Sequence, residues 1–385
     1  MLKLFRCLVV SFFKSKHKKC KRSFSQTTAD IGGNPASWQL TNLYNQSDNL
    51  FSMNKPEFQN NFNFLRFLFA SLVIVSHVPE LQDGNRSHEI LTQIFGTISF
   101  GELAVDCFFI LSGFLIVKSW LKRPAFVSFL SSRLLRIYPG FIASCLICAL
   151  LIGPLFSTPD YFQQFNVQQF FSGMLKLSLG GHPEVFPNTQ YPALNGSMWS
   201  IPYEFKCYLL VLFCGMLGLL NKRWSWLLLW TACTLAYVAI KLNGAPHKFE
   251  IYMRLVMAFS AGGCFCLYHD KLRWNSKLAW ASLALCSGLF FSHTMAEPAL
   301  SLFGSYAILY FALHAKAMHS FNTLPDVSYG TYLYAWPVNK IVLWYHPHIN
   351  LALAIITVFI LSVIAGSISW YAVERPFMRI KNRIT

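Results

Sequence analysis

The sequence predicts an all-α membrane protein, a polytopic helix bundle with about ten transmembrane helices. Of its 385 residues, 54% are hydrophobic and only 12% are charged, whereas soluble domains carry about 25% charged residues. Phe accounts for 36 residues and Trp for 11, as expected for lipid-facing surfaces and for the aromatic belts at membrane interfaces. Apolar segments of about 20 residues, the length that crosses a bilayer, recur along the chain.

Ten of these segments are expected to span the membrane. They cover residues 62–80, 101–120, 137–156, 199–220, 224–242, 250–268, 276–293, 297–315, 327–346 and 350–373. An even number of spans places both termini on one side, and most Lys and Arg residues between the spans fall on that same side. The positive-inside rule therefore predicts cytoplasmic termini. It also explains the net charge of +16, so no nucleic-acid partner is expected.

The regions outside the spans are predicted from composition. Residues 1–59 are basic and then polar, and we expect a disordered cytoplasmic tail. A natural start at Met53 and a lipid-binding arm are the alternatives. Residues 60–378 form the transmembrane domain, and residues 379–385 a short cytoplasmic tail. The eleven Cys residues lie mostly inside apolar runs, so neither a disulfide framework nor a metal site is expected.

Two ionisable residues, Arg66 and His77, lie in the first expected span. Eleven residues of helix make three turns plus about 20°, so both side chains point the same way, about 16 Å apart along the axis. With the N-terminus inside, Arg66 lies near the cytoplasmic surface and His77 in the outer half. Taken alone, the pair could be a snorkelling anchor and an interfacial residue.

Acidic residues are expected at the depth of His77. Glu102 and Asp106 lie at i and i+4 in the outer part of the second span, on one face. Glu204 lies about one turn into the fourth span. Ionisable groups inside a membrane usually face each other or a cavity, and they mark functional sites. A histidine beside a carboxylate can act as a general base, so we expect a site where these side chains meet.

Arginine residues are expected together at the cytoplasmic side. Arg133 and Arg136 share a face at i and i+3 if that segment is helical, and Arg66 lies at a similar depth. Arg is well suited to bidentate recognition of phosphate. The three are either ordinary positive-inside charges or a cationic cradle for a phosphorylated donor.

Six short motifs occur in order along residues 60–378. They are FLRFLFASLVIVSH, VDCFFILSGFLI, RLLRIYP, NGSMWSIPYE, SYGTYLYAWP and ERP. Through these motifs the chain resembles the acyltransferase-3 family of integral-membrane O-acyltransferases, which acetylate lipopolysaccharide O-antigens and other surface glycans. The resemblance implies an O-acetyltransferase of the bacterial inner membrane. It implies cytoplasmic acetyl-CoA as the acyl donor and a glycan or lipid-linked sugar as the acceptor.

The resemblance also implies roles for individual residues. His77 corresponds to the family's essential histidine, acting as general base or as transient acyl carrier, and Arg66 to the arginine of the same motif. We expect Glu204 or Asp106 to orient the His77 imidazole.

Arg133 and Arg136 correspond to the family's arginine pair, which is associated with acyl-CoA. Ser112 also falls on a motif position. Ser328 and Tyr329 are expected to contact the cofactor. Trp199 and Glu102 are expected to contact the substrate.

Other functions remain open from the sequence. A polytopic bundle with buried acids and a histidine also fits a proton-coupled transporter, although the two inverted halves that would favour one are not evident. A membrane protein without catalysis would leave the polar residues without a purpose. Some family members carry a C-terminal hydrolase-like domain. The sequence given ends at Thr385, so either the membrane domain acts alone or a separate partner takes the acyl group. The oligomeric state is not predicted.

Overall fold

The computed structural model describes residues 60–244 and 246–384. These residues form helices joined by turns and loops, and the described part contains no strand, so the all-α prediction is confirmed. The N-terminal tail predicted over residues 1–59, with its alternatives, lies outside the described residues. At the other end, the predicted short tail continues the last helix, α18 (Arg375–Ile384).

Besides α18, the described part of the chain contains ten helices of ten or more residues. In chain order they are α3 (Phe62–Asp83), α5 (Phe100–Lys122), α6 (Phe126–Ile147), α10 (Ile201–Met216), α11 (Arg223–Asn243), α12 (His247–Leu267), α13 (Ser276–Leu289), α15 (Ser305–His314), α16 (Ser328–Tyr345) and α17 (Leu351–Ser369). Short segments connect or extend them. These are η1 (Arg86–His88), α4 (Ile90–Phe95), η2 (Cys148–Ile152), α7 (Gly153–Leu155), α8 (Tyr161–Gln164), α9 (Val167–Leu175), η3 (Gly196–Ser200), η4 (Leu219–Asn221), α14 (Ala296–Ala299), η5 (Leu300–Gly304), η6 (His319–Thr323) and η7 (Trp370–Glu374).

Seven helices in the described part are long and apolar enough to cross a membrane. They cover Phe62–Asp83, Phe100–Lys122, Phe126–Leu155, Arg223–Asn243, His247–Leu267, Ala296–His314 and Leu351–Ile380. The other three predicted spans also fall on helices. However, α10 has 16 residues and α13 has 14, less than a bilayer requires. Helix α16 has 18 residues but contains several Tyr residues, an Asn and a Lys. The predicted count of about ten spans is therefore not confirmed.

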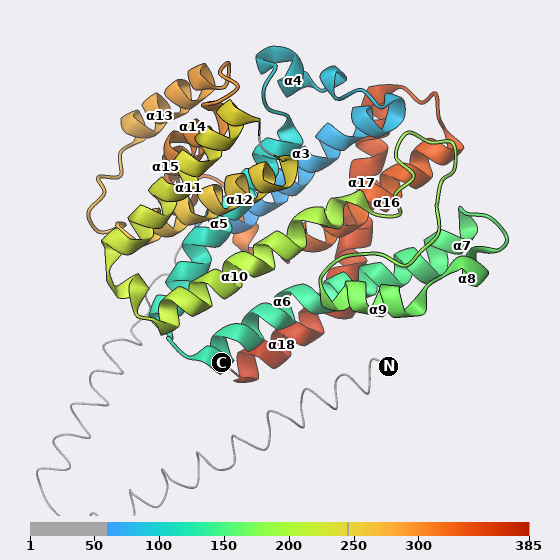
Figure 1. The fold of residues 1–385 in the computed structure, drawn as a ribbon, viewed down its shortest axis with the longest axis horizontal. Coiled ribbons are helices and arrows are strands. Elements are labelled where there is room, and N and C mark those ends of the chain that lie inside the picture. The colour runs from blue at the N-terminus through green and yellow to red at the C-terminus, as the bar shows by residue number, and fades with distance from the viewer. Residues whose placement is uncertain (1–59, 245, 385) are drawn as a thin grey trace, which may run out of the picture. The chain divides into compact units, whose positions relative to one another are not determined.

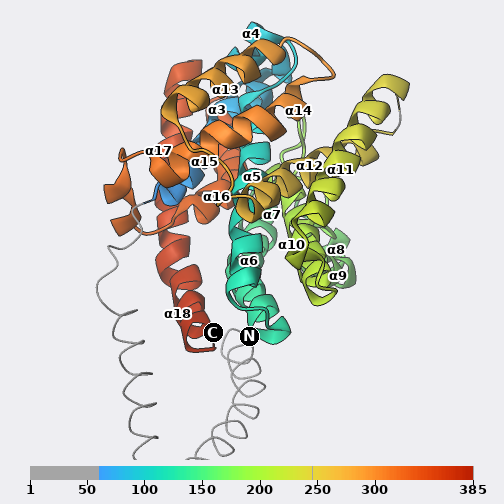
Figure 2. The same cartoon turned by 90° about the vertical axis from the view of Figure 1, so that its left-hand side faces the viewer.

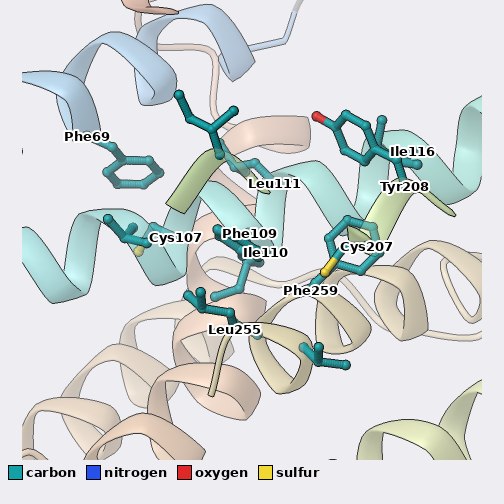
Figure 3. Close-up of a cluster of buried hydrophobic side chains, with 14 of the residues drawn as sticks. Phe69, Cys107, Phe109, Ile110, Leu111, Ile116, Cys207, Tyr208, Leu255 and Phe259 are labelled. Carbon is teal, nitrogen blue, oxygen red and sulfur yellow. The ribbon is translucent and has the colours of Figure 1, made fainter. Parts of the chain in front are cut away.

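Helix α5 lies at the centre of the bundle and packs against α3, α10 and α12 (Figure 1). Its crossing with α12 depends on glycine. A Cβ atom on Gly113 would lie 1.9 Å from the Phe259 carbonyl oxygen, and one on Gly262 would lie 2.0 Å from that of Ile110. Small residues allow such close approach of helix backbones. Figure 3 shows apolar side chains of α5, α10 and α12 filling the space around this crossing.

Helices α3 and α16 run in the same direction and define two ends of the site. Arg66, near the start of α3, contacts Asp326, just before α16. His77, near the end of α3, contacts the Trp336 ring of α16. We call the region around Arg66 and Asp326 the arginine end, and the region around His77 and Trp336 the histidine end. In Figure 2, α4, which follows α3, lies at one end of the bundle, and α6 and α18 extend to the opposite end.

A loop of residues 176–195 returns from α9 and packs against α16. Lys340 donates to the Thr189 hydroxyl at 2.5 Å, and the Trp336 indole donates to the Ala193 carbonyl at 3.0 Å. The Asn195 amide donates to the Leu333 carbonyl at 2.8 Å. These contacts place the loop over the histidine end.

Candidate active site

A cavity of about 270 Å³ lies between α3, α5, α6, α10 and α16. Its wall contains seven residues that the sequence motifs singled out. They are Arg66, Ser112, Arg133, Arg136, Glu204, Ser328 and Tyr329. These residues come from five helices and from segments up to 263 positions apart, so the fold brings together groups that are distant in the sequence.

Asp326 organises the arginine end of the cavity. Its Oδ2 accepts hydrogen bonds from Arg66 Nη1 at 3.2 Å and from Arg136 Nη2 at 2.6 Å, and its Oδ1 accepts one from Ser328 Oγ. Burial by itself would raise the pKa of Asp326, but the charges of Arg136 and Arg66 lower that pKa to about 2. The carboxylate is therefore ionised, and it holds two guanidinium groups side by side.

Arg133 lies in the same cavity in a different environment. Its Nε and Nη2 donate to the hydroxyl groups of Ser132 and Ser119, each at 3.1 Å, and its guanidinium lies over the Tyr208 ring. Among the described residues Arg133 forms no ion pair. Its positive charge is thus left for an anionic ligand to neutralise.

Glu204 lies in the cavity wall and is held by two hydroxyl groups. It accepts hydrogen bonds from Ser112 Oγ at 2.7 Å and from Tyr208 O–H at 2.5 Å. The side chain therefore faces the cavity and α5. The expected contact between Glu204 and His77 is not present in the described structure, because the sequence gives the depth of a side chain in the bundle but not the direction in which it points.

The carboxylate that contacts His77 is Glu80, which sequence reasoning missed. His77 Nδ1 lies 3.2 Å from Glu80 Oε2, and the other Glu80 oxygen accepts from Arg86 Nε at 2.9 Å. The His77 ring also packs edge-on against Trp336, with 5.3 Å between centroids. The available signal was the three-residue spacing of His77 and Glu80, which places both on one face of a helix.

Asp106 and Glu102 are paired with Arg254 of α12. Arg254 Nε lies 3.2 Å from Asp106 Oδ1, and Arg254 Nη1 lies 3.5 Å from Glu102 Oε1. The expected contact of Asp106 with His77 is therefore wrong, since Asp106 points toward α12. Glu102 Oε1 also lies 3.9 Å from Arg86 Nη1. Within the described part of the chain, Glu102 is thus linked to His77 through Arg86 and Glu80.

Trp199 lies outside the cavity. It belongs to η3, is 37% exposed, and packs edge-on against Tyr203 of α10. The cavity wall contains neither Trp199 nor Glu102, so the two residues expected to contact substrate are both away from it.

An aromatic layer of Phe69, Phe108 and Tyr332 closes the cavity toward the histidine end. The Phe108 ring lies 5.7 Å from that of Phe69 and 6.1 Å from that of Tyr332, and Phe108 and Tyr332 line the cavity. Tyr332 lies one helical turn before Trp336, whose ring contacts His77. His77 itself is not part of the cavity wall. Along α3 and α16, Phe69 and Tyr332 thus lie between the arginine end and the histidine end.

Comparison with known proteins gives the family. Residues 59–372 match the model of a family described as an acyltransferase domain. An O-acetyl transferase of Shigella phage Sf6 is 27% identical over 338 residues, covering 83% of this chain and 96% of the relative. Nodulation protein 10 of Rhizobium leguminosarum bv. viciae is 25% identical over 357 residues, covering 85% and 95% respectively. No solved structure matches. With its several apolar helices, the chain therefore belongs to this acyltransferase family and is a multi-pass membrane O-acyltransferase.

Proposed function

We propose that the enzyme transfers an acetyl group from cytoplasmic acetyl-CoA to a hydroxyl group of a cell-envelope glycan in the bacterial inner membrane. An O-antigen or lipopolysaccharide-type sugar is the proposed acceptor. The observation that carries the proposal is that one helix, α3, supplies a residue to each of two different groups of side chains. Arg66 joins an arginine-lined cavity, and His77, on the same helix face, pairs with a buried carboxylate. The O-acetyl transferase name of the phage relative supports the type of reaction.

The arginine end suits a phosphorylated donor. Three guanidinium groups, from Arg66, Arg133 and Arg136, line one cavity, and arginine binds phosphate oxygens through paired hydrogen bonds. Asp326 orients two of the three, and Arg133 supplies the least neutralised charge. In the proposal these groups hold the pyrophosphate and 3′-phosphate of acetyl-CoA. Ser328 and Tyr329 lie beside them in the cavity wall.

The histidine end suits the transfer step. The rise of the helix puts Arg66 and His77 about 16 Å apart, a distance that the extended pantetheine arm of the donor can cover. Phe108 and Tyr332 line the cavity on its way toward His77, so in the proposal the arm extends past their rings. In the proposal the arginine end and both termini lie at the cytoplasmic face, an orientation that the positive-inside rule supports.

The proposed chemistry follows from the state of His77. An ionised carboxylate only accepts hydrogen bonds, so Glu80 holds a proton on Nδ1 and leaves the Nε2 lone pair free. Nε2 removes the proton of the acceptor hydroxyl as its oxygen attacks the thioester carbonyl. The tetrahedral intermediate then breaks its C–S bond, and the thiolate takes the proton back from Nε2. The products are an O-acetyl ester and free CoA. An acetyl-histidine intermediate is the variant route.

The test uses the purified full chain, labelled acetyl-CoA and candidate glycans. The His77→Ala variant should transfer acetyl about 10²- to 10⁴-fold more slowly, the usual contribution of a general base. His346→Ala is the control, because His346 is exposed in the loop after α16 and should keep the wild-type rate. A His77→Ala enzyme as fast as wild type would overturn the proposal. Labelled acetyl bound to wild-type protein in the absence of glycan, and missing in the variant, would favour the acetyl-histidine route.

A further inference from the structure

The geometry points to Glu80 as the residue that positions His77, with Arg86 holding Glu80 in turn; this rests on the proposed function of His77. Both oxygens of the Glu80 carboxylate are engaged, one by His77 Nδ1 and one by Arg86 Nε. The Glu80 side chain is only 5% exposed. Burying a carboxylate is costly unless it is paired and hydrogen-bonded. Here its partners are the imidazole, one guanidinium and the hydroxyl group of Tyr191.

The local fold explains how Arg86 reaches Glu80. Helix α3 ends at Gly84, which has a φ of 78° and whose N–H donates to the Glu80 carbonyl at 2.9 Å. A positive φ of this kind favours glycine and is common where a helix terminates. The chain then reverses into η1, so that Arg86, six residues after Glu80, folds back over the carboxylate. The Arg86 side chain is 58% exposed, which leaves the carboxylate as its main anchor.

A second carboxylate anchors Arg86 from α5. Glu102 Oε1 lies 3.9 Å from Arg86 Nη1 and 3.5 Å from Arg254 Nη1. The other Glu102 oxygen accepts from the Ser99 N–H at 3.0 Å, in a capping box at the start of α5. Glu102 is therefore fixed by α5 and α12. In this arrangement Glu102 supports the His77 site through Arg86.

Glu80 acts on the reaction only through the imidazole. Holding the proton on Nδ1 selects the tautomer whose Nε2 can accept a proton, and the negative charge stabilises the imidazolium formed during the attack. Glu80 touches neither acceptor nor donor in this scheme. Its loss should therefore lower kcat while leaving the KM values for both substrates nearly unchanged.

The first experiment compares Glu80→Gln with wild type in the labelled acetyl-transfer assay. We expect kcat to fall about 10²-fold, at the lower end of a general base's contribution, and both KM values to change less than about twofold. The matched control is Glu89→Gln. Glu89 is also a buried carboxylate after α3, but it accepts from the Thr92 and Phe100 N–H groups, so its variant should keep the wild-type kcat.

The second experiment separates positioning from a structural effect. Glu80→Gln introduced into His77→Ala should change the residual rate less than about twofold. If Glu80 acts only through the imidazole, the effects of the two substitutions do not add once the imidazole is gone. Equal losses in both backgrounds would show a structural effect and overturn the inference. Arg86→Gln is a second test, because Arg86 is exposed and its replacement should not disturb the fold. We expect this variant to lower kcat about threefold to tenfold in the wild-type background. In the His77→Ala background it should not lower the residual rate.

The two proposals fail in different ways. Wild-type kcat in Glu80→Gln, together with a slow His77→Ala, would overturn the positioning role and leave the proposed function standing. Wild-type activity in His77→Ala would overturn the proposed role of His77 itself.

Discussion

Replacing Asp326 by Asn should destabilise the protein through the arginine end of its cavity. Asp326 lies 3.2 Å from Arg66 Nη1 and 2.6 Å from Arg136 Nη2, and its side chain is only 12% exposed. Asn has the charge of the protonated acid, so the variant mimics complete protonation of this one carboxyl. The two guanidinium groups would then lose the counter-charge that they share.

The lowered pKa of Asp326 gives the size of the effect. That pKa falls from 3.8 to about 2, against burial and because of Arg136 and Arg66. A shift of this size corresponds to about 2 kcal/mol of stability at neutral pH. Because the pKa is lower in the folded state, the contribution is complete above pH about 4 and is lost as the pH falls toward about 2. For a chain of this length a loss of 1 kcal/mol lowers Tm by about 1–1.5 °C, so Asp326→Asn should lower Tm by about 2–3 °C.

Buried cysteines supply the assay. Eight of the nine Cys residues in the described part are buried, and all nine are free thiols, so a thiol-reactive fluorogenic dye should report unfolding on heating. Asp270→Asn is the control, since Asp270 pairs with Arg223 at the surface and exposed pairs contribute at most about 1 kcal/mol. Equal Tm values for Asp326→Asn and Asp270→Asn at neutral pH would refute the reasoning. The difference between wild type and Asp326→Asn should shrink when both are measured near pH 3.

Two further variants test the donor site and the helix crossing. Arg133→Ala should raise the KM for acetyl-CoA about tenfold and leave the glycan KM unchanged. The reason is that a hydrogen bond to a charged group contributes about 1.5–3 kcal/mol. Equal increases in both KM values would argue against a donor site. Gly113→Ala should destabilise by 2 kcal/mol or more, since its Cβ would lie 1.9 Å from the Phe259 carbonyl oxygen, and overpacking typically costs about 1–3 kcal/mol. Gly288→Ala is the control, because its added Cβ would have no neighbour within 4 Å. In the same dye assay it should unfold at or above the wild-type temperature. A Gly113→Ala protein that unfolds at the same temperature as Gly288→Ala would contradict the close crossing.

The sequence predicted helices well and span lengths less well. Long apolar runs give the strongest signal of a membrane helix, and each of the ten predicted segments falls on a helix. The fourth predicted span shows the limit. Residues 199–220 include the end of η3, all of α10 and the start of η4. Gly218, with a φ of 70°, separates α10 from η4. A single glycine in an apolar run does not reveal whether it continues or ends a helix.

The sequence predicted those features of the candidate site that depend only on the position of a residue along its helix. Arg66 and Arg136 were expected at a common depth, and both donate to one carboxylate. That carboxylate, Asp326, lies between helices, where the sequence carries no periodic pattern to indicate its position. The partner of Asp106 was also missed. Arg254 belongs to α12, and which face of α12 meets α5 depends on the packing at Gly113, which periodicity does not report.

The aromatic layer of Phe69, Phe108 and Tyr332 also bears on the electrical insulation of the membrane. Charged groups lie on both sides of it, the arginine cluster on one and the His77–Glu80 pair on the other. A continuous water-filled path between them would let protons flow down the membrane potential, with about 2.3 kcal/mol released per charge for each 100 mV. The rings of Phe69, Phe108 and Tyr332 lie between the two groups of charges, and we expect them to interrupt such a path. In the proposed mechanism we therefore expect the layer to open only around the donor's acyl arm, which would let a group cross the bilayer while the bilayer stays sealed to ions.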